Sequence, residues 1–119
     1  MKKVMLIDDN EVMNSLLSKL LEIEGFMPVV STDLEWATLS EKLQKEEPDG
    51  LIMDVHLKNV DGIEIMSKIR HAPNLKPIKV LMTSGLDMHE ECLRAGADCF
   101  MTKPFMPADL INWLKEELI

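Results

Sequence analysis

Three short runs of apolar residues, each followed at once by polar residues, constrain the fold of this chain more than any other feature. The apolar residues of a run are continuous rather than alternating, which is typical of strands buried on both faces of a parallel sheet. Two weaker runs, Met27–Val30 and Cys99–Met101, are predicted to be edge strands. The strong runs are Val4–Ile7, which Asp8 and Asp9 follow, Leu51–Met53, which Asp54 follows, and Val80–Met82, which Thr83 and Ser84 follow.

Between these runs, apolar residues recur at the spacing of amphipathic helices. Pro107 is predicted to open the last helix, and Thr32–Glu35 resembles a capping box at the start of the second helix. Five repeats of strand and helix predict an α/β fold, in which a parallel sheet has helices on both faces. The first helix would end at Gly25, and its predicted buried face consists of Val12, Leu16, Leu17, Leu20 and Leu21.

Length and composition limit the classes of protein to consider. A chain of 119 residues, 46% of them hydrophobic, is predicted to form one domain over residues 1–119. No apolar run approaches the ~20 residues that span a membrane, and the apolar run after Met1–Lys3 is too short for the core of a signal peptide. We therefore expect a cytoplasmic protein with no membrane partner. The net charge of −8 argues against direct binding of nucleic acid.

Polar side chains follow three of the predicted strands, and a lysine follows the last one. The carboxyl ends of parallel strands meet at one edge of the sheet, where open α/β folds bind their ligands. Carboxylates gathered there repel one another unless a cation lies among them. Their hard oxygen atoms favour Mg²⁺, with Mn²⁺ as a relative. The residues expected to share this crevice are Asp8, Asp9, Asp54, Lys103 and either Ser84 or Thr83.

A carboxylate in such a crevice can also act as the nucleophile of phosphoryl transfer. Asp54 stands alone at the end of the central strand, which suits a phosphoacceptor. The adjacent Asp8 and Asp9 suit a pair of metal ligands instead. Lys103 and a hydroxyl such as that of Ser84 could hold the oxygens of the transferred group. The sequence therefore predicts a site that forms an aspartyl phosphate.

The order of these residues resembles the receiver domain of bacterial two-component response regulators, along essentially the whole chain. Each motif alone is weak, but the ordered series is specific. The resemblance implies a flavodoxin-like, doubly wound parallel sheet of five strands in the order 2-1-3-4-5, with five helices. The matching residues are Asp8-Asp9, Asp54, Asp61-Gly62, Ser84-Gly85, Ala95-Gly96-Ala97-Asp98 and Lys103-Pro104-Phe105.

The resemblance also implies a function for the acidic crevice. A histidine kinase or a phosphotransfer protein would donate a phosphoryl group to Asp54 as a step of a phosphorelay. Mg²⁺ would be held by Asp8 or Asp9, by Asp54 and by the backbone carbonyl of His56. The chain would be a signalling domain rather than a turnover enzyme, with self-phosphorylation and slow autodephosphorylation as its only chemistry.

A conformational switch is implied as well. Ser84 would move to bond the phosphoryl oxygen, and Phe100, three residues before Lys103, would turn inward as Ser84 moves. The peptide bond before Pro104 would be cis. The phosphoryl group would shift the population between an inactive and an active shape. An output domain or a target protein would read the change on the face formed by the fourth helix, the fifth strand and the fifth helix.

The chain departs from the family pattern in four places. Thr83 competes with Ser84 for the hydroxyl role, and we prefer Ser84 because four apolar or β-favouring residues precede it. The stretch from Ser84 to Lys103 is a few residues shorter than usual, which leaves the shape of the fourth helix open. Lys58 stands where a proline is common. Met106 replaces a capping residue, so the last helix should start less firmly.

Two other interpretations use the same residue types. Phosphatases of the haloacid dehalogenase type also combine an aspartate nucleophile, Mg²⁺, a hydroxyl and a lysine, but they place the nucleophile in a D-x-D motif after the first strand. Here that place reads Asp8-Asp9-Asn10. A degenerate receiver that works without phosphate is disfavoured by the intact set of polar residues. The sequence leaves open whether the chain is a stand-alone receiver or the first domain of a longer regulator.

Overall fold

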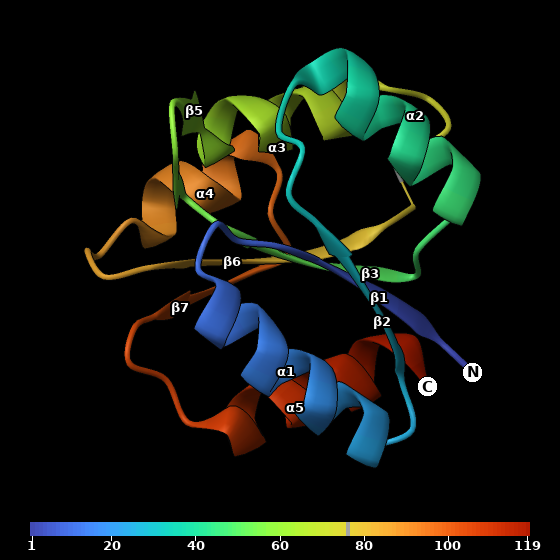
Figure 1. Ribbon diagram of the computed structural model, residues 1–119. Helices are drawn as coiled ribbons and strands as arrows, with labels where there is room; N and C mark the ends of the chain where they lie inside the picture. The colour runs from blue at the N-terminus through green and yellow to red at the C-terminus, as the bar shows by residue number, and fades with distance from the viewer. Residues whose placement is uncertain (76) are drawn as a thin grey trace.

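The structure, a computed structural model, describes residues 1–75 and 77–119. Strands and helices alternate along the chain, with a small extra hairpin after the third strand (Figure 1). The strands are β1 (Lys3–Ile7), β2 (Met27–Ser31), β3 (Gly50–Asp54), β4 (His56–Leu57), β5 (Val60–Asp61), β6 (Lys79–Ser84) and β7 (Cys99–Thr102). The helices are α1 (Glu11–Ile23), α2 (Trp36–Glu46), α3 (Gly62–His71), α4 (His89–Ala95) and α5 (Pro107–Leu118).

Within the described residues, five of the strands form one parallel sheet in the order β2-β1-β3-β6-β7. Numbering only these five strands turns the order into 2-1-3-4-5, so the predicted flavodoxin-like topology is confirmed. The short β4 and β5 pair with each other as a separate antiparallel hairpin. Both predicted edge strands, β2 and β7, do lie at the edges of the sheet.

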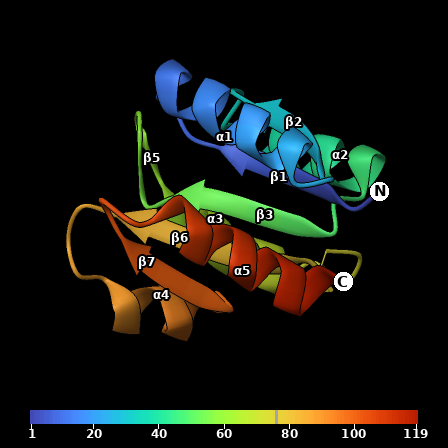
Figure 2. The ribbon, with the colours of Figure 1, turned by 90° about the horizontal axis from the view of Figure 1, so that it is seen from below.

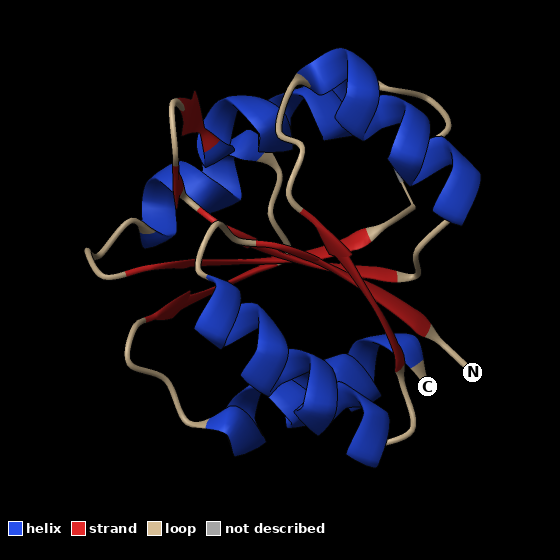
Figure 3. Cartoon of the chain, viewed as in Figure 1, coloured by secondary structure: helices blue, strands red, loops and turns tan. Residues whose placement is uncertain are grey.

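Helices cover both faces of the sheet, as the continuous apolar runs predicted. Helices α1 and α5 lie on one face, and α2, α3 and α4 lie on the other (Figures 2 and 3). Each face has its own apolar core, one built around α1 and α5 and the other around α2, α3 and α4. All five residues of β3 are buried, because this strand lies in the middle of the sheet with a helix layer on either side.

The predicted buried face of α1 is partly wrong. Leu17 and Leu21 are buried, but the side chains of Val12 and Leu16 are 69% and 61% exposed. The face that contacts the sheet instead contains Asn14, at positions i, i+3 and i+7 with the two leucines. The prediction failed because it assigned only apolar residues to the buried face.

The starts of two helices test the predicted capping. The capping box at Thr32–Glu35 is wrong: α2 begins at Trp36, and the Asp33 carboxylate instead accepts a hydrogen bond from the backbone N–H of Glu35 at 3.2 Å. Helix α5 begins at Pro107, as predicted. Within the described part of the chain, no side chain caps this start, as Met106 led us to expect.

A guanidinium joins α3 to the end of the short helix α4. Arg70 of α3 donates to the carbonyl oxygens of Gly96 and Ile78, each at 2.7 Å, and forms an ion pair with Asp98 at 2.6 Å. The same Asp98 oxygen accepts from the backbone N–H of Val80 at 2.8 Å. We call Arg70, Asp98 and the Gly96 and Ile78 carbonyls the Arg70 clamp. It fixes the carboxyl end of α4 to β6 and α3.

The helices are short compared with the thickness of a lipid bilayer. In the part of the chain that the structure describes, none of them combines the length and apolar character needed to cross a lipid bilayer. The longest, α1, has 13 residues, whereas a spanning helix needs about 20.

Candidate functional site

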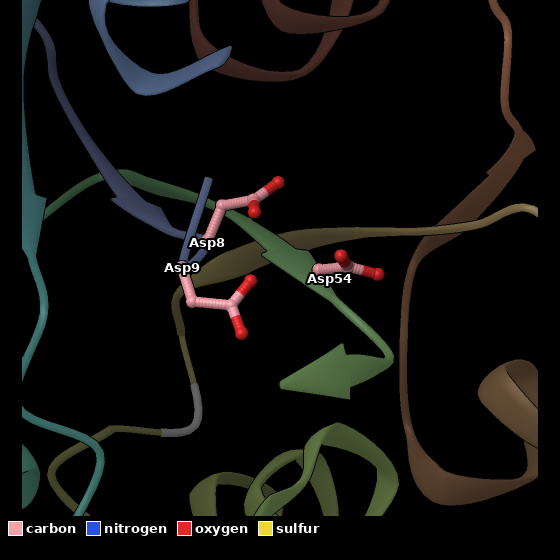
Figure 4. A group of neighbouring side chains, drawn as sticks. All are labelled: Asp8, Asp9 and Asp54. Carbon is pink, nitrogen blue, oxygen red and sulfur yellow. The ribbon is translucent and has the colours of Figure 1, made fainter. Parts of the chain in front are cut away.

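Three carboxylates meet at the carboxyl edge of the sheet. Asp8 and Asp9 follow β1, and Asp54 is the last residue of β3, the strand next to it (Figure 4). One ligand atom from each residue lies within 4.8 Å of the other two. The strand order reverses direction between β1 and β3, which is where open α/β sheets place their ligand sites. The prediction that the fold would gather these three side chains is confirmed by this geometry.

The backbone after β1 holds Asp8 in place. Its Oδ1 accepts a hydrogen bond from the N–H of Asn10 at 2.9 Å, which closes a tight side-chain turn. Asn10 then caps α1, because its Oδ1 accepts from the N–H of Met13 at 3.0 Å. Asp8 is only 8% exposed, whereas its neighbour Asp9 is exposed to solvent. One carboxylate is therefore fixed and the other is free to adjust.

Asp54 owes its position to the close approach of α3. Its Oδ1 accepts from the N–H of His56 at 3.2 Å. Gly62 opens α3, and a Cβ at this residue would lie 2.4 Å from the carbonyl oxygen of Asp54, so only glycine fits. Asp61 caps the same helix by accepting from the N–H of Ile63 at 2.9 Å. The Asp61-Gly62 pair therefore shapes the loop beyond Asp54.

Lys103 contributes the cation of the site. Its ammonium lies 3.3 Å from an oxygen of Asp8 and 3.1 Å from an oxygen of Asp54. Burial lowers the pKa of this ammonium, but the charge of Asp8 and the hydrogen bond to Asp54 outweigh burial, so the pKa is raised above its ordinary value of 10.5. The ammonium is therefore charged at neutral pH, and three carboxylates face one positive charge. The peptide bond from Lys103 to Pro104 is cis.

The two candidate hydroxyls point to opposite faces of the sheet. Both Thr83 and Ser84 are buried at the end of β6. Thr83 lines a small cavity with Asp54 and Lys103 on the side of α1 and α5. Ser84 lies on the other face, because alternate residues of a strand share a face and Met82 belongs to the core under α2, α3 and α4. The Ser84 hydroxyl accepts a hydrogen bond from the N–H of Leu86 at 3.0 Å.

Phe100 shares the face of Ser84. It pairs in register with Met82, two residues before Ser84, and is half-buried against the same core. The edge of one ring meets the face of the other between Phe100 and His89 of α4, with centroids 6.2 Å apart and ring planes at 83°. The Ser84 hydroxyl, the Phe100 ring and the start of α4 therefore all lie on the same face of the sheet.

The rim of the site is formed by the β4–β5 hairpin. His56 is exposed, and Lys58 occupies the tip of the hairpin beside Asn59, whose φ of 61° is left-handed. Asparagine tolerates this conformation better than most residues. Asp9, Lys58 and Asn59 line an open hollow next to the carboxylates. The rim is thus polar and accessible, and Lys58 lies in it at the position where the family pattern commonly has a proline.

Asn14 is a residue of the site that the sequence analysis missed. Its amide nitrogen donates to the carbonyl oxygen of Asp8 at 2.7 Å, and its side chain lines the same small cavity as Thr83 and Lys103. A signal for it exists in the sequence, since Asn14 falls at helical spacing with Leu17 and Leu21. A polar residue on a buried face needs a partner, and that partner is the backbone of the site.

The fold and the site together define a flavodoxin-like domain whose acidic cluster could hold a divalent cation. Comparison with known protein families places it more narrowly. Residues 4–115 match the family model of the response regulator receiver domain. The chain therefore belongs to the response regulator receiver domain family, as the resemblance suggested.

Individual relatives agree with this assignment. The chain is 34% identical over 110 residues to the alkaline phosphatase synthesis transcriptional regulatory protein PhoP of Bacillus subtilis, covering 92% of this chain but 45% of that protein. Among solved structures it is similar to the chemotaxis protein CheY4 of Vibrio cholerae, with a TM-score of 0.86, 27% identity and 99% of both chains covered. The receiver domain of a sensor histidine kinase from Pseudomonas aeruginosa PAO1, solved with a magnesium ion coordinated in its active-site cleft, shares the fold. For this pair the TM-score is 0.83, the identity 22%, and the coverage 98% of this chain and 96% of the other.

Proposed function

We propose that residues 1–119 form a phosphoacceptor domain that takes a phosphoryl group onto Asp54 from a histidine kinase or a phosphotransfer protein. The observation that carries this proposal is the placement of Asp54 beside Asp8 and Asp9, with the ammonium of Lys103 between Asp54 and Asp8. A nucleophilic carboxylate, a set of metal ligands and a cation for the phosphoryl oxygens are thus within reach of one another.

The donor atoms of the site fit Mg²⁺. Three carboxylates offer hard oxygen ligands and more negative charge than Lys103 balances, and Mn²⁺ has similar preferences. Asp8, Asp9, Asp54 and the backbone carbonyl of His56 would hold the ion. When bound, it would neutralise charge on the phosphoryl oxygens. The magnesium ion in the receiver domain from Pseudomonas aeruginosa PAO1 supports this choice.

The chain's own residues would divide the transfer between them. An oxygen of Asp54 attacks phosphorus, the P–N bond to the donor histidine breaks, and the electron pair stays on the imidazole nitrogen. The other oxygen of Asp54 stays oriented by the N–H of His56. Lys103 exchanges a carboxylate partner for a phosphoryl oxygen, which stabilises the charge of the transferred group. The domain signals rather than turns over substrate, and releases phosphate only by slow autodephosphorylation.

Thr83 lines the cavity beside Asp54 and Lys103, whereas Ser84 faces the side of Phe100 and α4. We propose Ser84 as the switch hydroxyl because of this link to α4. It shares the face of Phe100 and of α4, and its present partner is the N–H of Leu86 at the start of the loop to α4. A move of Ser84 toward the phosphoryl group would break that bond and free the loop, and Phe100 would turn inward behind it. The phosphoryl group would thereby favour one of two shapes.

The face formed by α4, β7 and α5 would transmit this change to an output domain or a target protein. The chain spans about half the length of the curated relatives it matches, and these are transcriptional regulatory proteins. An output domain beyond the receiver would fit that pattern. The receiver itself carries a net charge of −8, so we propose that it does not contact nucleic acid directly.

A small phosphodonor tests the proposal. We expect acetyl phosphate with Mg²⁺ to add one phosphoryl group to the native chain, as read by intact mass, and to add none without Mg²⁺. Asp54→Asn should abolish the adduct, whereas Asp109→Asn, an exposed aspartate of α5, should leave it unchanged. An adduct that persists in Asp54→Asn would overturn the assignment of the acceptor. No adduct in the native chain, with Mg²⁺ shown to bind, would overturn the proposal for small donors.

A further inference from the structure

Only the nitrogen of the buried Asn14 side-chain amide has a hydrogen-bond partner among the described residues. Asn14 lies in the first turns of α1 and is only 5% exposed. Its Nδ2 donates to the carbonyl oxygen of Asp8 at 2.7 Å. Its Oδ1 is fully buried and has no hydrogen-bond partner among the described residues. A buried acceptor without a donor is rare in folded proteins and points to a partner such as ordered water.

A small cavity lies where that partner would be. Its volume is about 10 Å³, and its lining includes Asn14, Asp8, Asp54, Thr83 and Lys103, with apolar side chains of α1, β1 and β3 around them. This is close to the smallest space that holds one water, and a water needs two to four polar partners. The lining supplies acceptors and donors, and the space holds one water at most.

We propose that one buried water is part of this site, and that Asn14 is a positioning residue that acts through it. The water donates to Asn14 Oδ1 and accepts from the ammonium of Lys103, with the hydroxyl of Thr83 as a further partner. Lys103 has three N–H groups, and Asp8 and Asp54 take two of them. The third can reach a water beneath the carboxylates.

The consequence of this arrangement rests on the proposed function. Phosphoryl transfer requires Lys103 to leave a carboxylate and bond a phosphoryl oxygen at the mouth of the site. A fixed water below the ammonium keeps Lys103 from sinking into the sheet as it changes partner. The direct bond from Asn14 to Asp8 holds the backbone of the same loop. Partners that orient metal ligands typically change metal affinity or activity by 10–100-fold when removed, and Asn14 holds the backbone of Asp8, one of the proposed ligands.

The water can be tested without any phosphodonor. We expect NOEs between a long-lived water and the side-chain amide of Asn14 in the ¹⁵N-labelled, Mg²⁺-free chain. Thr83→Val removes one partner of the water and leaves the bond from Asn14 to Asp8 intact, so it should weaken these NOEs. Absence of the NOEs from the native chain would overturn the buried water. Unchanged NOEs in Thr83→Val would overturn its proposed placement.

The positioning role is tested by the rate of phosphorylation with acetyl phosphate. Asn14→Leu keeps the size of the side chain but removes both polar atoms, and we expect the rate to fall by about tenfold or more. Met13→Leu is the matched control, because Met13 lines the same cavity with an apolar side chain. Equal rates in the two variants would overturn the positioning role. If the native chain forms no adduct at all, the proposed function fails, while the NOEs still decide whether the water exists.

Discussion

Two charged networks in this domain differ in how their charges are balanced. At the carboxyl edge of the sheet, three carboxylates share the ammonium of Lys103. In the Arg70 clamp, the described contacts of the guanidinium include one carboxylate and two carbonyl oxygens, and the carboxylate of Asp98 also accepts a backbone N–H. Both networks join segments that are distant in the chain. Among the residues that the structure describes, the first network has an excess of negative charge and lies beside a buried acceptor without a partner, and the second has neither.

We interpret this difference as follows: the Arg70 clamp stabilises the fold, and the acidic cluster is a candidate ligand site. A balanced, hydrogen-bonded network stabilises the fold, so removing any member should destabilise it. An unbalanced network carries internal repulsion that a cation would relieve, so removing one of its carboxylate charges should stabilise the free protein. Removing a charge is therefore expected to have opposite signs in the two regions. Arg70→Met and Asp9→Asn test this, and Gly96→Ala tests the packing around the clamp.

The largest effect is expected at Gly96. Its φ of 113° is unfavourable for any residue with a side chain, and a Cβ would lie 2.3 Å from Cγ of Arg70. We expect Gly96→Ala to lower the free energy of unfolding by roughly 3 kcal/mol, from backbone strain and displacement of Arg70 together. Gly25→Ala is the control, since Gly25 has a φ of 90° and open space around its Cβ. Urea unfolding should show a distinctly smaller loss for Gly25→Ala, and equal losses would mean that contact with the clamp does not matter.

A somewhat smaller loss is expected when the guanidinium itself is removed. Arg70→Met keeps much of the aliphatic stem, but it removes the positive partner of Asp98 and the donor to the carbonyl oxygens of Gly96 and Ile78. We expect about 2 kcal/mol of destabilisation in urea, because hydrogen bonds to charged groups are worth roughly 1.5–3 kcal/mol. Arg94→Met is matched to it, because the Arg94–Glu90 pair is exposed and 3.9 Å apart. Little change in both variants would remove the basis for calling the clamp structural.

The smallest effect, and the one with the opposite sign, is expected at Asp9. This carboxylate is exposed and adds to the repulsion around Asp8 and Asp54. Asp9→Asn should stabilise the Mg²⁺-free protein by roughly 0.5 kcal/mol, a size typical of charge interactions near a surface. With saturating Mg²⁺ the native chain should regain the advantage, since it keeps more ligands for the ion. Paired urea titrations in EDTA and in Mg²⁺ measure both signs, and destabilisation in EDTA would break the comparison.

The sequence predicted the acidic site better than the rest of the molecule because two features identify each strand end. These are an unbroken apolar run and the polar residue that follows it. An unbroken apolar run identifies β3 as a central strand, and the carboxylate that follows it identifies Asp54. The parallel sheet makes the meeting of Asp54 with Asp8 a matter of topology. The order of the strands came from the family resemblance, because apolar runs alone do not say which strands are neighbours.

Features that depend on particular side-chain partners were not predictable in the same way. Asn14 was missed because a polar residue was not considered for the buried face of α1, and Val12 was wrongly assigned to that face. The start of α2 depends on whether Asp33 or Thr32 bonds the backbone, which the residue types alone do not decide. Arg70 finds two of its partners 26 and 28 residues away, and no local pattern marks such pairs.

The position of two adjacent hydroxyls at the end of β6 has a consequence for which helix layer a conformational change would reach. Successive side chains of a strand point to opposite faces of the sheet. Neighbouring residues such as Thr83 and Ser84 therefore contact different helix layers. If Ser84 is the switch hydroxyl, its movement would be felt first by the layer of α2, α3 and α4, whereas movement of Thr83 would be felt first by the layer of α1 and α5. Under the proposed function, the choice between two neighbouring residues would therefore decide which helix layer responds to phosphorylation.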